Sequence, residues 1–442
     1  MNHNTFFEKT PPTKLFILVT APGVISMLVS SLYYTIDGIF VGRLLGADAF
    51  AALNLALPLV IINFSVADLI GVGSAIPIAI KLGEKDERSA CSIFSAACIM
   101  IVLSASILGG FLFFFAEDLM RLMGADSILT DLGSQYLKVY ALCSPLTTSL
   151  FAVDNYLRIC GRIRQSMCLN ILMSVLCAAL EFLFLFVFRF GIWGAALATC
   201  LGMFFCTALG FLPFIRGKLQ LKFVKPKIDR KTFYNIIANG SPSFLNNIAG
   251  RLFSVVMNMI LLHFGGATAV TAYGVLMYAD GLVQPVLYGL CDSLQPAIGY
   301  NWGAQHFARV KALARRCFVV CAALSVGMTA LIFFGRVHLT QIFVHATDTA
   351  VIEMSAQALS LGSFAYLTRW ISLAAQSFFS AIGIAGKATW ISISMAFLFP
   401  SFLLLVLAPF GLTGLWLNLP FTCLFGALLS IGLYLKTKKK NT

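Results

Sequence analysis

Residues 90–116 read ACSIFSAACIMIVLSASILGGFLFFFA, a stretch without a charged side chain that follows Arg88 and Ser89 and ends directly before Glu117. A helix needs roughly 20 mostly apolar residues to cross a bilayer, and this run is long enough. Runs of the same kind recur from Leu15 to Leu435 with short polar interruptions. Of the 442 residues, 59% are hydrophobic and 11% are charged, a balance that does not suit a soluble core. The sequence therefore predicts an integral membrane protein.

Glycine, proline and charged residues divide the chain into twelve predicted spans, so the expected fold class is an all-α integral membrane protein with two bundles of six transmembrane helices. The spans are expected at residues 15–42, 49–79, 90–116, 133–157, 164–188, 192–215, 233–263, 268–299, 310–335, 349–380, 387–408 and 412–435.

Basic residues concentrate in alternating connections between these spans. One side would hold Lys81, Lys85, Arg88, Arg158, Arg162, Arg164, the basic block of residues 216–231, Arg309, Lys311, Arg315, Arg316, Lys387, Lys436, Lys438, Lys439 and Lys440. The other side would hold only Arg43, Arg121, Arg189 and Arg336. The positive-inside rule then predicts a multi-pass protein of the cytoplasmic membrane with both termini in the cytoplasm. The net charge of +13 thus indicates topology, and nucleic acid is not an expected partner.

An offset of about 220 residues aligns several features of the chain with one another. The pairs are Pro22 with Pro242, Gly46 with Gly266, Gly83 with Gly303, Gly191 with Gly411 and Gly194 with Gly414. We therefore expect residues 1–215 to form an N-terminal bundle and residues 233–442 a C-terminal bundle, joined by a basic cytoplasmic linker at 216–232. Both halves begin on the same side, so their axis should run along the membrane normal. Pro22 and Pro242 would permit a bend early in each half.

Four short segments carry a family resemblance. They read IDGIFVGRLLG at 36–46, followed by Ala51-Ala52-Leu53; LRICG at 157–161; GIWGAALAT at 191–199; and QPAIGYNWGA at 295–304. These segments are similar, in order and position, to signatures of the multidrug and toxic compound extrusion (MATE) family. The chain resembles in particular the bacterial branch that includes staphylococcal exporters. The resemblance implies the export of organic, often cationic, compounds in exchange for a cation.

The resemblance also implies a cation-coupling site in the N-terminal half. The positions that match the family pattern are Asp37, Cys177, Glu181, Ala195 and Thr199. Two of them depart from it, because Cys177 stands in place of an asparagine and Glu181 in place of an aspartate. Sodium at Asp37 and Glu181 would prefer oxygen ligands, so the loss of the amide favours the proton as the coupling ion. No other metal and no cofactor are expected.

The acidic residues inside the predicted spans are functional candidates on physical grounds, because charge is costly within a bilayer. The N-terminal half holds Asp37, Asp68, Asp154 and Glu181 with no basic residue in mid-span, whereas Asp280 and Asp292 share the C-terminal half with Arg251 and Arg369. Acids of the first half must be protonated, bind a cation or face water. Acids of the second half could instead belong to structural ion pairs.

Helical spacing gathers the first group. Cys177 and Glu181 are four residues apart, as are Ala195 and Thr199, so each pair shares a helix face. Asp37 and Glu181 are expected to form a carboxylate pair that shares a proton or a cation in the outer half of the membrane. The alternative is that Asp37 merely caps its helix beside Arg43.

The candidates for a substrate cavity are Asp68, Asp154, Asn155, Asp280 and Asp292. Asp68 lies deep in its span, where it could meet a cationic substrate. Asp154 and Asn155 lie near a helix end, where Asp154 is equally suited to pair with Arg158. The 40 phenylalanines and 14 methionines could line a forgiving cavity, although most would face lipid or other helices.

The function predicted is therefore secondary active antiport of small molecules by a single chain embedded in the bilayer. Neither a phosphate-binding G-x-x-x-x-G-K-[ST] loop nor an H-E-x-x-H metal motif occurs, so an enzyme is not expected. The twelve cysteines show no C-x-x-C pair or metal-ligand spacing and are interpreted as packing residues. Two alternatives remain: a flippase for lipid-linked sugars from the same superfamily, and a channel or structural membrane protein.

Overall fold

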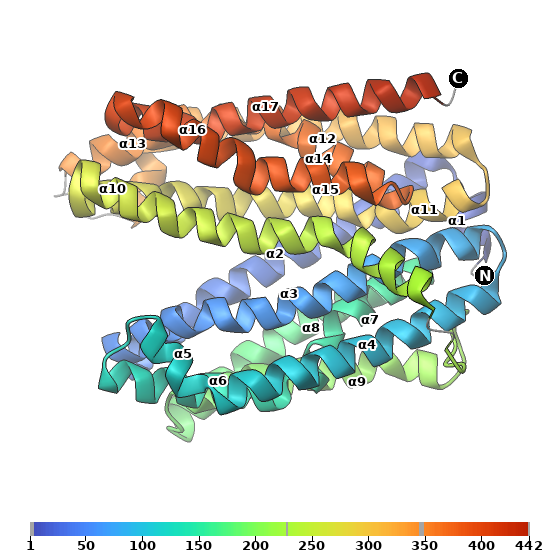
Figure 1. Ribbon diagram of the computed structural model, residues 1–442, viewed down its shortest axis with the longest axis horizontal. Helices are drawn as coiled ribbons and strands as arrows, with labels where there is room; N and C mark the ends of the chain where they lie inside the picture. The colour runs from blue at the N-terminus through green and yellow to red at the C-terminus, as the bar shows by residue number, and fades with distance from the viewer. Residues whose placement is uncertain (1–3, 227–228, 344–348, 441–442) are drawn as a thin grey trace. The chain divides into compact units, whose positions relative to one another are not determined.

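The computed structural model describes residues 4–226, 229–343 and 349–440, and every regular element within them is helical (Figure 1). The expectation of an all-α fold is confirmed. The first half of the chain contains α1 (Asn4–Lys9), α2 (Pro12–Leu45), α3 (Ala47–Gly83), α4 (Glu87–Phe114), α5 (Ala116–Leu122), α6 (Ser127–Thr147), α7 (Ser149–Ile159), α8 (Ile163–Phe182), the π-helical turn η1 (Leu183–Val187) and α9 (Ile192–Ile215).

The second half follows a similar order. It contains α10 (Arg230–Ser293), α11 (Gln295–Gly303), α12 (Phe307–Phe343), α13 (Thr349–Ser363), α14 (Ala365–Ala381), α15 (Ala385–Ile393), the π-helical turn η2 (Ser394–Leu398), α16 (Phe399–Leu407), the 3₁₀ turn η3 (Ala408–Phe410) and α17 (Gly411–Lys440). The long α10 is two helices in sequence, because Gly266 inside it has non-helical dihedral angles. That break falls between the predicted spans 233–263 and 268–299.

Nine helical segments within the described ranges are long and apolar enough to cross a membrane. One of them, Ala385–Thr437, contains two predicted spans. The predicted spans 133–157 and 349–380 are also helical but are not among the nine; a turn divides the first at Thr148 and the second at Phe364. Many membrane-spanning helices are thus present in the described part of the chain.

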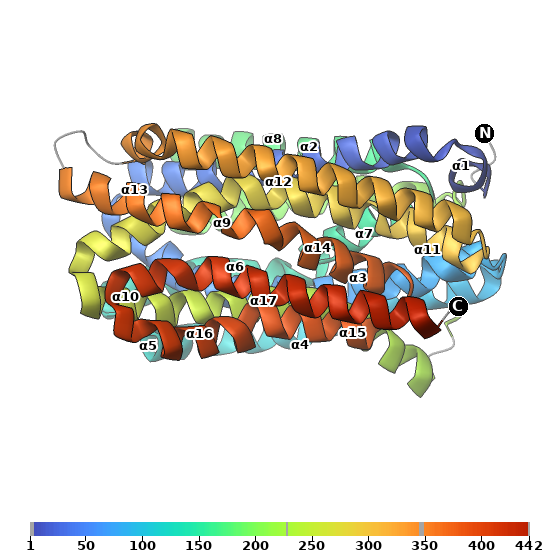
Figure 2. The same ribbon diagram turned by 90° about the horizontal axis from the view of Figure 1, so that it is seen from above.

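Contacts between residues divide the chain into two units. Unit 1 comprises residues 1–11, 21–244 and 299–306, and unit 2 comprises residues 12–20, 245–298 and 307–442. In unit 1, α3 packs against α4, α6 and α7, while α9 packs against α6 and α8; in unit 2, α14 packs against α12 and α17 (Figures 1 and 2). The predicted bundles at 1–215 and 233–442 are continuous stretches of sequence, whereas each contact unit combines several segments. The bundle limits therefore stay a prediction.

The first long helix of each half changes unit close to its proline. In α2 the change falls between Thr20 and Ala21, directly before Pro22, and in α10 it falls two residues after Pro242. Thr13, at the start of α2, accepts hydrogen bonds from Arg316 of α12 within unit 2 at 3.1 and 2.9 Å. Proline removes a backbone donor, so both helices have a weakened point where they pass from one unit to the other.

The internal repeat is visible in the backbone. Positive φ angles recur 220 residues apart at Gly46 and Gly266, at Lys85 and Gln305, and at Gly191 and Gly411. A positive φ in Lys85 or Gln305 is unusual for a residue with a side chain, so its recurrence at the same offset is strong evidence for two copies of one design. The predicted pseudo-symmetry is confirmed.

Within unit 1, the end of α3 meets the end of α11 through two glycines that are related by the repeat. A Cβ atom added to Gly83 would lie 2.1 Å from the carbonyl oxygen of Tyr300, and one added to Gly303 would lie 2.1 Å from the carbonyl oxygen of Ile80. The contact is reciprocal, because 80 and 300 are separated by the same 220 residues as 83 and 303. Glycine at both positions allows the two backbones to touch.

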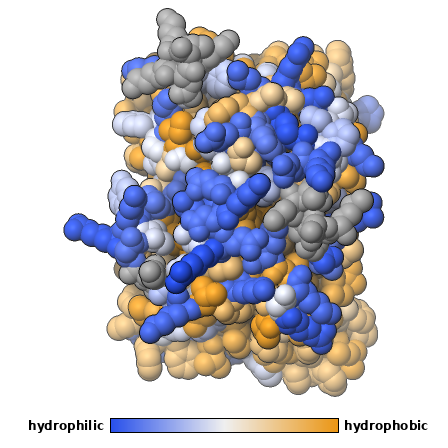
Figure 3. All heavy atoms as spheres, turned by 90° about the vertical axis from the view of Figure 1, so that its right-hand side faces the viewer, coloured by the Kyte–Doolittle hydropathy of each residue, from blue (hydrophilic) through white to orange (hydrophobic). Residues whose placement is uncertain are grey.

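Hydrophilic side chains gather on the face shown in Figure 3, and hydrophobic side chains border them. Large apolar side chains such as Ile107, Phe114 and Leu405 are at least 74% exposed along the helices. Exposed apolar surfaces of this kind match a hydrocarbon environment.

Candidate functional site

Two acidic residues from distant parts of the chain come together inside unit 1. Asp37 on α2 is 8% exposed and Glu181 at the end of α8 is fully buried. Their carboxyl groups lie close enough to interact directly. Neither residue forms an ion pair with a basic side chain within the described ranges, and Asp37 is not joined to Arg43 there.

The chemistry of this acid pair follows from its donors. Both oxygens of Glu181 lack a hydrogen-bond partner among the residues that the structure describes. A carboxylate can only accept a hydrogen bond, whereas a protonated carboxyl group can also donate one. A single proton held between Asp37 and Glu181 would therefore convert two repelling charges into a hydrogen-bonded pair.

Polar groups from three helices surround the acid pair. The hydroxyl groups of Tyr33 and Thr199 lie 2.7 Å apart and are hydrogen-bonded, and the Cys177 thiol donates to the carbonyl oxygen of Thr199 at 3.7 Å. Cys177 is fully buried, and Thr199 and Tyr33 are 4% and 3% exposed. Carboxylate and hydroxyl oxygens could hold a sodium ion, but the thiol of Cys177 is a poor partner for a hard cation.

Ala195 lies one turn before Thr199 on α9 and is 1% exposed. Its side chain belongs to an apolar cluster formed by α2, α3, α6 and α9, with Val41, Leu53 and Tyr136 among its members. This cluster holds α2, which carries Asp37, and it includes Leu185 of η1, four residues after Glu181, so the site lies against an apolar core.

Three tyrosines near the acid pair were not anticipated from the sequence. Tyr33 precedes Asp37 by one helical turn, and Tyr136 and Tyr140 of α6 lie within electrostatic range of Asp37. The spacing of four residues between Tyr33 and Asp37, and again between Tyr136 and Tyr140, was a usable signal, because such residues share a helix face. What it could not show was which neighbouring helix that face meets.

Asp154 lies in a separate polar cluster of unit 1. Its carboxylate forms an ion pair with Arg158 at 2.8 Å and accepts hydrogen bonds from Ser166 and from Asn170, the latter at 2.7 Å. The guanidinium of Arg158 also donates to Ser166 at 3.0 Å. This arrangement corresponds to the helix-end pairing that the sequence left open for Asp154. The neighbouring Asn155 donates to the carbonyl oxygen of Phe151 at 3.0 Å.

Unit 2 contains a cavity of about 420 Å³ that is lined by polar and apolar side chains. At its wall Asp280 and Arg369 form an ion pair at 2.6 Å, and Tyr366 donates to Asp280 at 3.0 Å. In the orientation that satisfies both ends of its amide, Gln284 donates to Asp280 at 3.2 Å and accepts from Arg369 at 3.1 Å. Arg251 also lines the cavity. The cavity wall thus carries a neutralised charge pair.

The two remaining cavity candidates lie elsewhere. Asp68 is half-buried on α3 in unit 1. Asp292, near the end of α10, accepts a hydrogen bond from Gln295 at 2.9 Å and is not among the residues that line the unit 2 cavity. The structure therefore places the five candidates in several locations and not in one pocket.

A known protein family matches both halves of the chain. The MatE family model matches residues 22–183 and 242–408, which are the two copies of the repeat. The chain belongs to the MatE family. The sequence resemblance is thereby confirmed, and a MatE chain with helices of this length and hydropathy is a multi-pass membrane protein.

Relatives and solved structures agree with this assignment. The chain is 26% identical over 419 residues to the multidrug export protein MepA of Staphylococcus aureus strain NCTC 8325, covering 92% of this chain and 90% of the relative. It is 25% identical to the MepA of Staphylococcus saprophyticus, covering 93% and 90%. The resemblance to the staphylococcal branch of the MatE family is confirmed.

Two solved structures share the fold. A crystal structure of MATE in complex with MaL6 gives a TM-score of 0.93 at 19% identity, with 100% of both chains covered. An outward-facing multidrug resistance MATE family transporter of the MOP superfamily gives 0.92 at 19% identity, with 99% and 98% covered. The predicted MATE-type architecture of two related helical bundles is thus confirmed for the fold.

Proposed function

We propose that this chain exports organic, chiefly cationic, drugs or metabolites in exchange for protons, by alternating access. The proposal agrees with the multidrug export named for its relatives. The observation that carries it is the buried pair of Asp37 and Glu181, which comes from two helices and has no basic partner in the described part of the chain. A buried acid that lacks a counter-charge must bind a proton or a cation.

The proton is the favoured coupling ion on the chemistry of the donor set. Cys177 presents sulfur where an oxygen ligand would serve sodium, and Thr199 is already hydrogen-bonded to Tyr33. Sodium at Asp37 and Glu181 is the alternative, and it has two carboxylates in its favour. The two ions give different results in the experiment below.

Loading of the acid pair would act on helix packing. With both carboxyl groups ionised, α2 and α8 would repel each other at Asp37 and Glu181; one shared proton would draw them together. Tyr33 couples this change to α9, since it lies on α2 and bonds to Thr199. Since Pro22 is close to the point where α2 passes between units, a local change at Asp37 has a mechanical route along one helix.

We propose the unit 2 cavity as a place for the exported compound. Its volume of about 420 Å³ is within the range typical of small-molecule sites, about 300–1,000 Å³. Met257, Met277, Tyr273 and Trp416 line it, and soft or aromatic side chains of this kind tolerate varied organic cations. The pairing of Asp280 with Arg369 leaves a carboxylate that could exchange its partner for a cationic substrate.

We place the proposed transporter in the cytoplasmic membrane as a single chain. Both termini would lie in the cytoplasm, with the chain in the cytoplasmic membrane, because basic residues favour that side of the helices. A single chain with no cofactor would suffice, since the acid pair and the cavity are each complete within one unit. Transport, and not catalysis of a reaction, is the activity proposed.

The test is export of a fluorescent organic cation from proteoliposomes under an imposed proton gradient and, separately, an imposed sodium gradient. The wild type is compared with Asp37→Asn and Glu181→Gln. The matched control is Asp118→Asn, which removes an acid that is exposed on α5.

The expected result is export driven by the proton gradient, its loss in both site variants, and its retention in the control. If only the sodium gradient drives export, and both site variants abolish it, the coupling ion at this site is sodium and not the proton. Export that is indifferent to both site variants would refute the acid pair as the coupling site. If neither gradient moves any cation offered, the flippase hypothesis is the next to test.

A further inference from the structure

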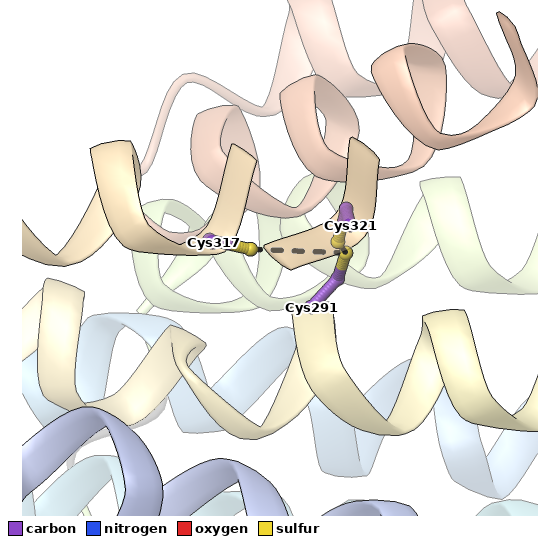
Figure 4. Close-up of side chains that lie close together, drawn as sticks. All are labelled: Cys291, Cys317 and Cys321. Carbon is purple, nitrogen blue, oxygen red and sulfur yellow. Dashed lines mark hydrogen bonds between the residues drawn. The ribbon is translucent and has the colours of Figure 1, made fainter. Parts of the chain in front are cut away.

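Three cysteine thiols meet inside unit 2, away from both sites described above. Cys291 lies near the end of α10, and Cys317 and Cys321 lie one turn apart on α12 (Figure 4). The three residues are 2%, 6% and 0% exposed. The sequence suggested packing residues only, because the spacing between Cys291 and the other two matches no metal motif.

The distances between the sulfur atoms are those of a metal site. The Sγ atoms of Cys291 and Cys321 lie 3.6 Å apart, those of Cys291 and Cys317 lie 4.0 Å apart, and all three lie within 4.8 Å of one another. Three sulfur ligands at about 2.3 Å from one metal ion are about 3.8 Å apart in a tetrahedral site and about 4.0 Å apart in a planar one. The two separations that involve Cys291 therefore already lie close to these values, and the third has to close by at most about 1 Å.

We propose that Cys291, Cys317 and Cys321 form a binding site for a soft monovalent cation of the Cu(I) class. Thiolates select soft cations such as Cu(I). Zinc almost always takes four ligands in structural sites, and the cluster offers three. Each thiol that becomes a thiolate ligand releases one proton, so binding is coupled to proton release.

Neighbouring groups hold the cluster in place. Ser377 of α14 donates a hydrogen bond to the carbonyl oxygen of Cys291 at 2.9 Å, and Gln295 donates to Ser377 at 3.2 Å. Cys317 and Cys321 are fixed relative to each other by the regular turn of α12. A bound ion would tie α10, which carries Cys291, to α12, which carries Cys317 and Cys321.

The experiment is a titration of the purified full-length protein in detergent, kept reduced and free of oxygen. Cu(I) is supplied as its coloured complex with bicinchoninate, and its transfer to the protein is followed by loss of that colour. Every sample carries Cys143→Ala, because Cys143 lies beside Cys200 and the two form a competing thiol pair in unit 1. The test variants are Cys291→Ser and Cys321→Ser, and the matched control is Cys423→Ala, a fully buried thiol elsewhere in unit 2.

The expected result is one equivalent of Cu(I) withdrawn from the chelator by the parent and the control. At least tenfold weaker binding is expected in each test variant. X-ray absorption of the loaded parent should show three sulfur neighbours around copper, a readout that does not depend on whether the variants fold. Equal binding in parent and test variants would overturn the proposal, as would fewer than three sulfur neighbours or the absence of binding by the parent.

Discussion

The reciprocal contact between Gly83 and Gly303 predicts an unusual double-mutant result. A C···O contact is comfortable at about 3.3 Å, and the added Cβ at either position would lie 2.1 Å from a backbone oxygen. The ends of α3 and α11 must therefore move apart by about 1.2 Å. Overpacking of this kind costs about 1–3 kcal/mol, and we expect Gly83→Ala and Gly303→Ala each to lower the free energy of unfolding by about 2 kcal/mol.

The double variant should cost about 2 kcal/mol and not about 4 kcal/mol, because the separation that accommodates one methyl group also accommodates the other. The assay is reversible unfolding in mixed detergent micelles, with the double-mutant cycle evaluated at one detergent composition. Gly110→Ala in α4 is the control: a Cβ there meets nothing within 4 Å, so stability should rise by about 0.5–1 kcal/mol. Additive losses from the two single variants would refute a shared contact, and unchanged stability would refute the close approach itself.

Three further predictions concern single residues. Asp280→Asn leaves Arg369 buried without its partner and should lower the free energy of unfolding by about 3–5 kcal/mol, which Arg369→Met in the same chain should largely restore; unfolding followed with a thiol-reactive dye measures both. Tyr33→Phe removes the hydroxyl that joins α2 to α9 and should slow proton-driven dye export without preventing folding, whereas unchanged export would separate this bond from coupling. Asp86 caps α4, and hydrogen bonds from the side chain and backbone of Ser89 lower the pKa of its carboxyl group. The cap therefore stabilises the protein above the ordinary pKa of aspartate, and this stabilisation is lost as pH falls through the lowered pKa. Asp86→Ala should lower the free energy of unfolding by about 1 kcal/mol at pH 7 and leave it unchanged in strong acid, which thermal melting at the two pH values would show.

The acid pair shows how far sequence reasoning reaches into a site. Buried charge is expensive in any membrane protein, so Asp37 and Glu181 stood out from the sequence regardless of fold. The participation of Tyr33 and Tyr140 did not, because a tyrosine is equally at home in lipid contact, in a core or at an interface. Only the fold, which brings Tyr140 of α6 within electrostatic range of Asp37 on α2, distinguishes these cases.

Asp154 and Asp280 illustrate the opposite outcome. Both were candidates for the same reason as Asp37, and both have an arginine partner in the structure, Arg158 and Arg369. The first pair spans one helical turn and was foreseeable as an alternative. The second joins residues 89 positions apart, and no local pattern specifies which acid an arginine will meet.

The sequence by itself determined that the chain is a membrane protein of repeated helical halves, because hydropathy, proline and glycine positions and the distribution of charge act locally or through a fixed repeat. It also placed most helix ends to within a few residues; α9 was predicted at 192–215 and ends at those residues. Beyond the acid pair, which was expected from the sequence, tertiary structure decided which side chains meet: the neutralised cavity wall and the cluster of Cys291, Cys317 and Cys321. Such meetings depend on the rotation and contact of whole helices, which are set by packing along their full length and leave no signature in the spacing of the residues involved.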